Sequence, residues 1–172
     1  MADSGKNCAR GIVAALRSGG IDIVSTLPDA WLGDLIGGIE DDPSMKLIRV
    51  TREDEGLGIC AGAWLGGHRG ALVAQNAGLL LSTNVLAGIA YHHQIPAVML
   101  IAMRGGPFDN QYYHAYKARV TEPVLKGVGI PYHHINGPDD FPVIASAWQQ
   151  ASLFRMPVAL LLHRGALVDG AA

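Results

Sequence analysis

Six short runs of consecutive aliphatic and β-branched residues recur along the chain, separated by longer stretches in which apolar and polar residues mix. Unbroken apolar runs of this length are typical of strands covered on both faces, because neither side of such a strand meets water. The run at 96–102 is the most apolar and the run at 131–135 the weakest. We therefore predict six strands, at residues 21–26, 46–50, 70–75, 96–102, 131–135 and 157–162.

The segments between these runs have the length and composition of helices, and two of them end at glycine pairs, which favour a helix stop. Asp139 or Asp140 begins the last of them, where a carboxylate is stabilised by the helix dipole. The predicted helices span residues 6–18, 30–40, 53–65, 79–92, 121–126 and 140–154. This alternation predicts an α/β fold of three layers (α/β/α), in which a six-stranded, mostly parallel sheet lies between two layers of helices.

The least regular segment is 104–119, which contains Gly105, Gly106, Pro107 and three tyrosines. We expect a long loop here, and long loops at the carboxyl ends of parallel strands are where such folds bind ligands. The whole chain has 172 residues, the size of one ordinary domain. No repeat, low-complexity tract or long linker divides it, so we expect a single domain over 1–172.

Composition narrows the classes of partner. The chain is 49% hydrophobic and 16% charged, so we expect surface buried against another subunit, although a two-faced parallel sheet also raises the apolar fraction. A net charge of −2 and the absence of a basic stripe argue against nucleic acid and anionic membranes as partners. No transmembrane run or secretion signal is visible, and the two distant cysteines indicate no disulfide framework. We expect a cytoplasmic protein.

Three carboxylates, Glu53, Asp54 and Glu55, crowd the start of the helix predicted after the second strand. Acids in a first helical turn are stabilised by the dipole by roughly 0.3–1 kcal/mol each, which is the simpler interpretation. Alternatively, one of the three lies at the carboxyl end of the strand and faces a ligand. Glu53 is nearest to the strand and is therefore the best placed.

A second strand-to-helix junction reads Gln75-Asn76-Ala77-Gly78. Asn and Gly fit a tight turn with positive φ, which is a purely structural interpretation. The glycine would also let a ligand approach the backbone, beside the unpaired N–H groups of the next helix. The chain has neither a Gly-x-Gly-x-x-Gly motif nor a phosphate-binding loop motif, so a self-contained dinucleotide or phosphate site is not supported.

The seven histidines give no metal-binding spacing. The adjacent pairs His92-His93 and His133-His134 do not converge on a helix or a strand, so we expect no metal site within the chain. His114 differs because it lies in the irregular segment among tyrosines. A surface histidine and a ligand-contacting one are equally open interpretations there. No serine has a nucleophile-elbow context.

Taken in order, these junctions resemble the pyrimidine-binding domain of thiamine-diphosphate enzymes. In that family a glutamate opens a helix and a glycine follows nine positions later, as Glu53 and Gly62 do here. The junctions at 27–29, 75–79 and 95–105 resemble the other strand ends of that domain. Within the family the chain is most similar to the sulfopyruvate and phosphonopyruvate decarboxylases, and the similarity spans nearly the whole chain.

The resemblance implies roles for individual residues. Glu53 would hydrogen-bond N1′ of the cofactor's aminopyrimidine and share a proton with it, which makes it both catalytic and cofactor-binding. Asp29 and His114 would transfer protons during decarboxylation of a 2-oxoacid. Arg104 and His114 would contact the substrate, with Lys117 and Arg119 as further basic candidates, although all the loop charges could simply be solvated. The remaining implied cofactor contacts are Pro28, Asn76 and Gly78.

The resemblance also implies a second chain. The family's Gly-Asp-Gly…Asn motif, which holds Mg²⁺ and the diphosphate, does not occur here; Gly33-Asp34-Leu35 lies in a predicted helix. We therefore expect a separate β subunit that carries this motif, an αβ hetero-oligomer, and possible self-association of the chain alone. Three alternatives stay open: another thiamine-diphosphate activity such as carboligation, a non-catalytic regulatory subunit, and a flavodoxin-like binder of small ligands.

Overall fold

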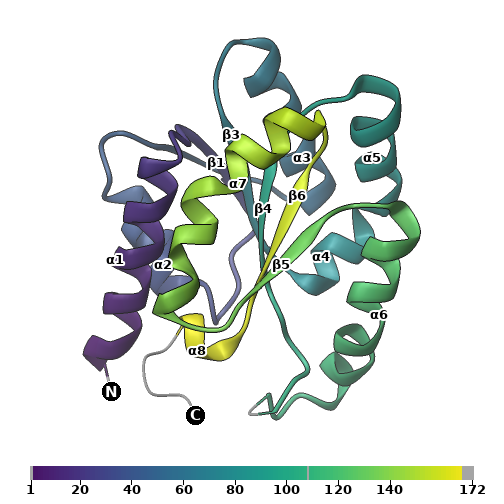
Figure 1. Cartoon of the computed structure of the whole chain (residues 1–172). Coiled ribbons are helices and arrows are strands. Elements are labelled where there is room, and N and C mark those ends of the chain that lie inside the picture. The colour runs from purple at the N-terminus through teal and green to yellow at the C-terminus, as the bar shows by residue number, and fades with distance from the viewer. Residues whose placement is uncertain (1, 108, 168–172) are drawn as a thin grey trace.

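The computed structural model describes residues 2–107 and 109–167 and is built on one six-stranded sheet with strand order β2-β1-β3-β4-β6-β5 (Figure 1). Every neighbouring pair of strands is parallel. The six predicted strands are confirmed, with ends shifted by no more than two residues: β1 Ile23–Thr26, β2 Lys46–Arg49, β3 Gly70–Gln75, β4 Val98–Ala102, β5 Tyr132–Ile135 and β6 Val158–Leu162.

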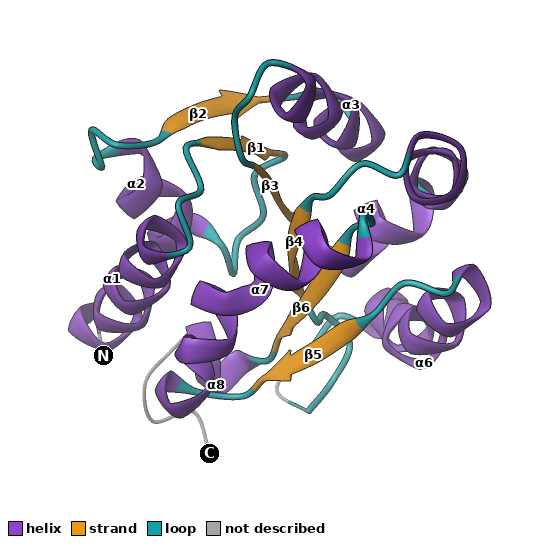
Figure 2. Ribbon diagram, turned by 45° about the horizontal axis from the view of Figure 1, so that its top comes forward, coloured by secondary structure: helices purple, strands orange, loops and turns teal. Residues whose placement is uncertain are grey.

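Helices cover both faces of this sheet, which confirms the predicted three-layer α/β fold. One layer contains α1 Ala2–Ser18, α2 Gly33–Glu40, α7 Phe141–Phe154 and the short α8 Arg164–Leu167, and the other contains α3 Glu53–Leu65, α4 Asn76–Leu81, α5 Thr83–Ala87 and α6 Tyr112–Val128 (Figure 2). Among the described residues, no helix is both long and apolar enough to cross a lipid bilayer.

The central strands place alternate side chains in two separate cores. In β3, Val73 packs into the core under α1 and α7, whereas Leu72 packs into the core under α3. In β4, Leu100 and Met99 divide in the same way. Burial on both faces explains why these strands read as unbroken apolar runs.

One helical prediction was wrong in its bounds and continuity. The helix expected at 79–92 starts at Asn76 and is divided into α4, α5 and a π-helical turn, Gly88–His93. The first break falls at Ser82, whose Oγ donates to the Gly78 carbonyl. Such side-chain bonds compete with helical hydrogen bonding. The helix predicted at 140–154 is confirmed, because α7 spans Phe141–Phe154 with Asp140 as its N-cap, directly after a 3₁₀ turn at Pro138–Asp140.

The loop expected at 104–119 was also wrong in extent, because α6 begins at Tyr112 and continues to Val128. The predicted helix at 121–126 is only its central part. The buried residues of α6 are His114, Thr121 and Leu125. They recur at helical spacing, but two of the three are polar, so they form no apolar stripe, which is the signal that predicts a helix.

The strand order creates two crevices at the carboxyl edge of the sheet. The chain leaves β1 toward α2 and leaves β3 toward α4, which lie on opposite faces. It likewise leaves β4 toward α6 and β6 toward α8 on opposite faces. Parallel α/β sheets bind ligands where neighbouring connections diverge in this way.

Candidate active site

The three acids at the start of α3 have different surroundings. Glu55 accepts hydrogen bonds from the backbone N–H groups of Thr51 and Arg52, and Asp54 pairs with the Arg52 guanidinium at 2.8 Å. These two carboxylates stabilise the helix start, as the electrostatic interpretation predicts. Glu53 is turned inward and is only 6% exposed. It has no hydrogen bond or ion pair with any residue that the structure describes.

Gly78 lies in direct contact with Glu53. A methyl group at Gly78 would overlap Cγ, Cδ and Oε1 of the Glu53 side chain. The positive-φ interpretation of this glycine was wrong, because it sits in the first turn of α4 and the described glycines with positive φ are Gly20, Gly67, Gly105 and Gly129. The missing side chain serves a close approach, and the group that approaches is a carboxylate of the chain itself.

The same junction contains two unpaired acceptors. Gln75 Oε1 and Asn76 Oδ1 are buried and have no hydrogen-bond donor among the described residues. The amide nitrogen of Asn76 is used, because it donates to the Arg104 carbonyl at 2.9 Å. Buried acceptors are nearly always paired in folded proteins. Among the described residues, the carboxyl edge of the sheet therefore carries three side chains with unpaired acceptor oxygens, those of Glu53, Gln75 and Asn76.

Beside this junction, four charged or titratable side chains form a buried network. Arg104 Nη1 donates to both oxygens of Asp29 at 3.0 and 2.9 Å, and its Nε donates to Asp109 at 2.8 Å. The same Asp109 oxygen lies 2.8 Å from His114 Nδ1. The structure thus brings Asp29, Arg104 and His114 together, although Arg104 and Asp29 are 75 residues apart. Asp109 completes the network, and the sequence analysis missed it.

The loop that carries Asp109 is held closely against the start of α6. Gly105 has φ of +92°, and a side chain there would collide with the backbone carbonyl of His114. Its N–H donates to Asp109 at 2.9 Å. Only glycine combines this backbone conformation with so close an approach. A glycine pair followed by proline predicted a turn, but nothing local indicated which helix the turn would touch.

Hydrogen bonds keep Asp109 ionised. Burial by itself would raise the pKa of this carboxyl, but donors from Arg104, Gly105 and Gln111 and contact with His114 together lower it below its usual range. With two carboxylates around one guanidinium, Arg104 is fully neutralised by its partners. The other basic candidates lie on α6, where Lys117 is 5.6 Å from the Tyr113 ring and Arg119 is exposed.

We expect Asp109 to make the chain sensitive to acid. Its pKa is lower in the folded chain than in the unfolded chain, so the unfolded state takes up the proton first as pH falls. The free energy of unfolding should therefore decline below about pH 4, the ordinary range of Asp. Asp109→Asn should cost about 3 kcal/mol at pH 7, as breaking a buried ion pair does, and should flatten this decline. Urea unfolding at pH 7 and at about pH 3 measures both the cost of the substitution and the decline.

The matched control is Asp139→Asn, which removes the same group from an exposed position. It should change the free energy of unfolding by less than about 0.5 kcal/mol. If the free energy of unfolding declined equally with falling pH in the wild type and in Asp109→Asn, Asp109 would not be the group that makes the chain sensitive to acid.

The predicted cofactor contacts lie at neighbouring strand ends. Pro28 is exposed on the loop after β1, and Asn76 and Gly78 follow β3. Among the described residues, no group of three or more histidine, cysteine or carboxylate side chains is arranged to hold a metal ion. At the carboxyl edge of the sheet, Glu53 can accept a hydrogen bond from a ring that carries N–H donors, and His114 can exchange protons. The described residues assemble no set of metal ligands there.

Comparison with known proteins finds relatives in sequence and in fold. The chain is 33% identical over 157 residues to sulfopyruvate decarboxylase subunit alpha of Methanococcus maripaludis, covering 91% of this chain and 94% of the relative. It is 33% identical over 164 residues to phosphonopyruvate decarboxylase of Streptomyces viridochromogenes, covering 94% of this chain but 41% of that longer protein. No family model matches the chain.

Among solved structures, the chain superposes on a 2-oxoglutarate:ferredoxin oxidoreductase from Magnetococcus marinus with 2-oxoglutarate, coenzyme A and succinyl-CoA bound. The TM-score is 0.74 at 16% identity, and the match covers 94% of this chain and 29% of that one. The superposition shows a shared fold and, at this low identity, nothing beyond it. The sequence relatives above are the more closely related proteins.

Proposed function

Because the chain belongs to the family of sulfopyruvate decarboxylase α subunits, we propose that it is the pyrimidine-binding subunit of a thiamine-diphosphate-dependent 2-oxoacid decarboxylase. Its substrate is a short 2-oxoacid with a second acidic group, as in sulfopyruvate or phosphonopyruvate, and its products are an aldehyde and carbon dioxide. One observation carries the proposal: Glu53 is buried against Gly78 at the carboxyl edge of the sheet and has no partner among the described residues.

The residues at this edge fit the aminopyrimidine ring of thiamine diphosphate. That ring offers a nitrogen able to carry a proton and an amino group with two N–H donors. Glu53 is the acceptor for the protonated nitrogen, and Gln75 and Asn76 add acceptor oxygens that have no donor among the described residues. A buried acceptor without a donor costs about 1–3 kcal/mol. A ring that supplies donors removes this cost, with Pro28 and Gly78 as further contacts.

When bound, thiamine diphosphate supplies the electron sink for the electrons that remain as carbon dioxide leaves. Glu53 holds a proton at N1′ of the pyrimidine. His114 exchanges protons with the substrate through Nε2, because Asp109 binds Nδ1 and selects the tautomer protonated there. Asp29 is the second proton-transfer candidate. Arg104 positions both carboxylates, and its contact with the substrate uses Nη2, which neither carboxylate occupies.

The diphosphate and Mg²⁺ are held by a partner chain in this proposal. The relative from Methanococcus is itself named as an α subunit, and this chain covers nearly all of it. The sequence contains no Gly-Asp-Gly. We propose a β subunit with Gly-Asp-Gly…Asn, joined to this chain in an αβ hetero-oligomer that forms the single site from two chains.

We expect decarboxylase activity to require both chains. The full chain with thiamine diphosphate and Mg²⁺ should release little carbon dioxide from 3-sulfopyruvate, 3-phosphonopyruvate or pyruvate, and calorimetry should detect little cofactor binding. Adding the β subunit should restore both. Tight cofactor binding and turnover by the chain alone would refute the two-chain proposal, and inactivity of the mixture on every 2-oxoacid would refute the function.

A further inference from the structure

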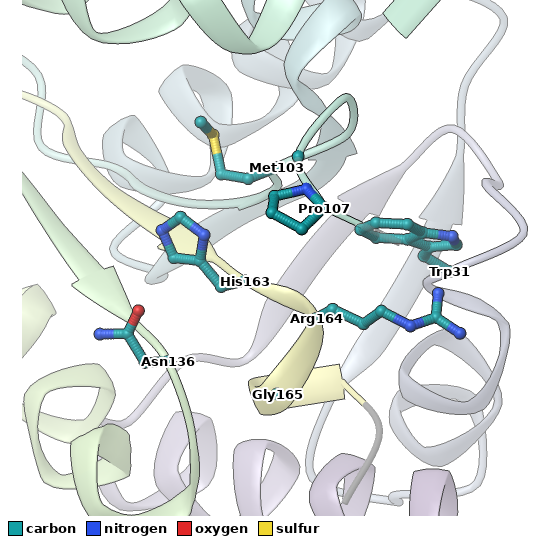
Figure 3. A pocket seen from close by; sticks show the side chains of 8 residues that line it. Trp31, Met103, Pro107, Asn136, His163, Arg164 and Gly165 are labelled. Carbon is teal, nitrogen blue, oxygen red and sulfur yellow. The ribbon is translucent and has the colours of Figure 1, made fainter. Parts of the chain in front are cut away.

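A cavity of about 260 Å³ opens at the second crevice, over the carboxyl ends of β4 and β6. Ligand pockets for drug-sized molecules hold about 300–1,000 Å³, so this one suits a smaller group. Figure 3 shows His163 and Arg164, adjacent at the end of β6, extending toward different parts of its wall. The wall includes Trp31, Met103, Pro107, Asn136, His163 and Arg164.

Arg164 is the positive charge of this cavity. Its guanidinium carbon lies 5.1 Å from the centre of the Trp31 ring, and it has no hydrogen bond or ion pair with any described residue. Asp34 lines a neighbouring hollow with Arg164 but lies outside ion-pair distance. Arg104 lies 4.4 Å from the same ring and has two carboxylate partners. Two arginines thus flank one tryptophan, and only Arg164 keeps its charge for a ligand.

His163 and Asn136, two other hydrogen-bonding side chains in the wall of this cavity, are neutral. His163 accepts or donates a hydrogen bond with His134 Nδ1 at 2.8 Å. Burial, and secondarily His134, lower the pKa of His163, which favours a neutral ring at pH 7. The Asn136 amide makes one long contact, 3.4 Å, with Asp140 and keeps a second N–H. An anion at this cavity would meet one guanidinium and two hydrogen-bonding groups.

The position of the cavity suits the far end of a short substrate. The strand order places β6 two strands from β3, whose end carries the contact between Gly78 and Glu53. Neighbouring strands are about 4.8 Å apart, so the two strand ends are separated by roughly 10 Å. Between them lies the end of β4, with Arg104 and, through Asp109, His114. A substrate that reacts near His114 can therefore reach the cavity.

We infer that Arg164, supported by Trp31, Asn136 and His163, forms the subsite for the second acidic group of the substrate, a sulfonate or phosphonate. This inference rests on the proposed function and names the residue that selects the substrate. Arginine suits the group because its planar fork donates two parallel hydrogen bonds to tetrahedral oxyanions, whereas lysine offers a point charge.

The test compares substrates with and without the second acid. In the assembled two-chain enzyme, Arg164→Gln should lower the ratio of kcat/KM for 3-sulfopyruvate to kcat/KM for pyruvate by about 10- to 100-fold, the effect of losing charge-assisted hydrogen bonds. The ratio for 3-phosphonopyruvate should fall similarly if that acid is also a substrate. Arg164→Lys should give an intermediate ratio. Arg155→Gln removes an exposed arginine at the opposite edge of the sheet and should leave the ratio unchanged.

A binding measurement separates this inference from the proposed function. Calorimetry of the two-chain enzyme with 3-sulfopropionate and 3-phosphonopropionate, which lack the oxo group, should show affinity about 10-fold or more weaker in Arg164→Gln than in the wild type. Circular dichroism checks that the variant is folded. An unchanged substrate ratio and unchanged analogue affinity would overturn the subsite and leave the decarboxylase standing. An enzyme that turns over no 2-oxoacid yet loses analogue binding in Arg164→Gln would overturn the function instead.

Discussion

Replacing Glu53 by glutamine should lower the decarboxylation rate of the two-chain enzyme by about 10²–10⁴-fold, the usual contribution of a group that holds or transfers a proton. Glutamine has nearly the same shape but cannot hold the proton at N1′. The side chain makes no hydrogen bond within the described chain, so the substitution breaks no internal hydrogen bond and removes only a weak interaction with Arg52 and the helix dipole. The free energy of unfolding should therefore change little, whereas the turnover rate should fall by the factor given above. Initial rates with 3-sulfopyruvate at saturating cofactor measure the effect.

Glu55→Gln is the matched control. It removes an equal charge two residues away, from a carboxylate that caps α3 through Thr51 and Arg52. It should cost up to about 1 kcal/mol of stability, as lost capping does, and leave the rate within about twofold. Wild-type rates in Glu53→Gln would contradict the site and favour a regulatory subunit, for which this residue is dispensable.

Gly78→Ala should reduce activity by about 10²-fold, because displacement of a reacting group by about 1 Å has effects of that size. The added methyl would overlap the end of the Glu53 side chain. That end can rotate away, so the chain should fold, and the higher helix propensity of alanine offsets about 1 kcal/mol of any strain. The substitution should therefore lower the activity while the free energy of unfolding changes little. Steady-state rates together with urea unfolding give both.

A double mutant tests whether Gly78 acts through Glu53. If it does, Gly78→Ala should cost little further activity in the Glu53→Gln background, because coupled residues are not additive. Gly127→Ala is the control, since this glycine of α6 has open space around it. It should stabilise the chain by about 0.5–1 kcal/mol and leave the rate unchanged. Fully additive losses in the double mutant would show that Gly78 acts elsewhere.

The buried network around Arg104 gives Arg104 and Arg164 different roles. The family resemblance made Arg104 a candidate substrate contact. In the structure its charge is matched by Asp29 and Asp109, and the network as a whole carries no excess positive charge. The guanidinium without a counter-ion in this part of the described chain is that of Arg164. Its position after β6 follows the same strand-end rule that selected Glu53.

Local pattern was enough to predict the layers of this protein and to single out one candidate residue, whose role came from the family resemblance. Runs of apolar residues predicted β3, β4 and β6 most clearly, because a strand buried on both faces is apolar at almost every position. The edge strands β2 and β5 are only partly buried and contain polar residues. The order of strands and helices then predicted a parallel sheet. Glu53 was identified because it directly follows a strand, and residues in that position lie at the ligand edge of such a sheet.

Tertiary structure alone decided what each of these residues touches. Gly78 approaches Glu53 across 25 positions, and Arg104 meets Asp29 across 75. The first part of α6 was missed because its buried residues His114 and Thr121 are polar, so the helical spacing of its buried positions is not visible as an apolar pattern. The periodicity of apolar residues shows which face of a helix or strand is buried. Pairing between distant side chains depends instead on the order of the strands and on the space between elements. Neither the strand order nor that space can be predicted from a local stretch of sequence.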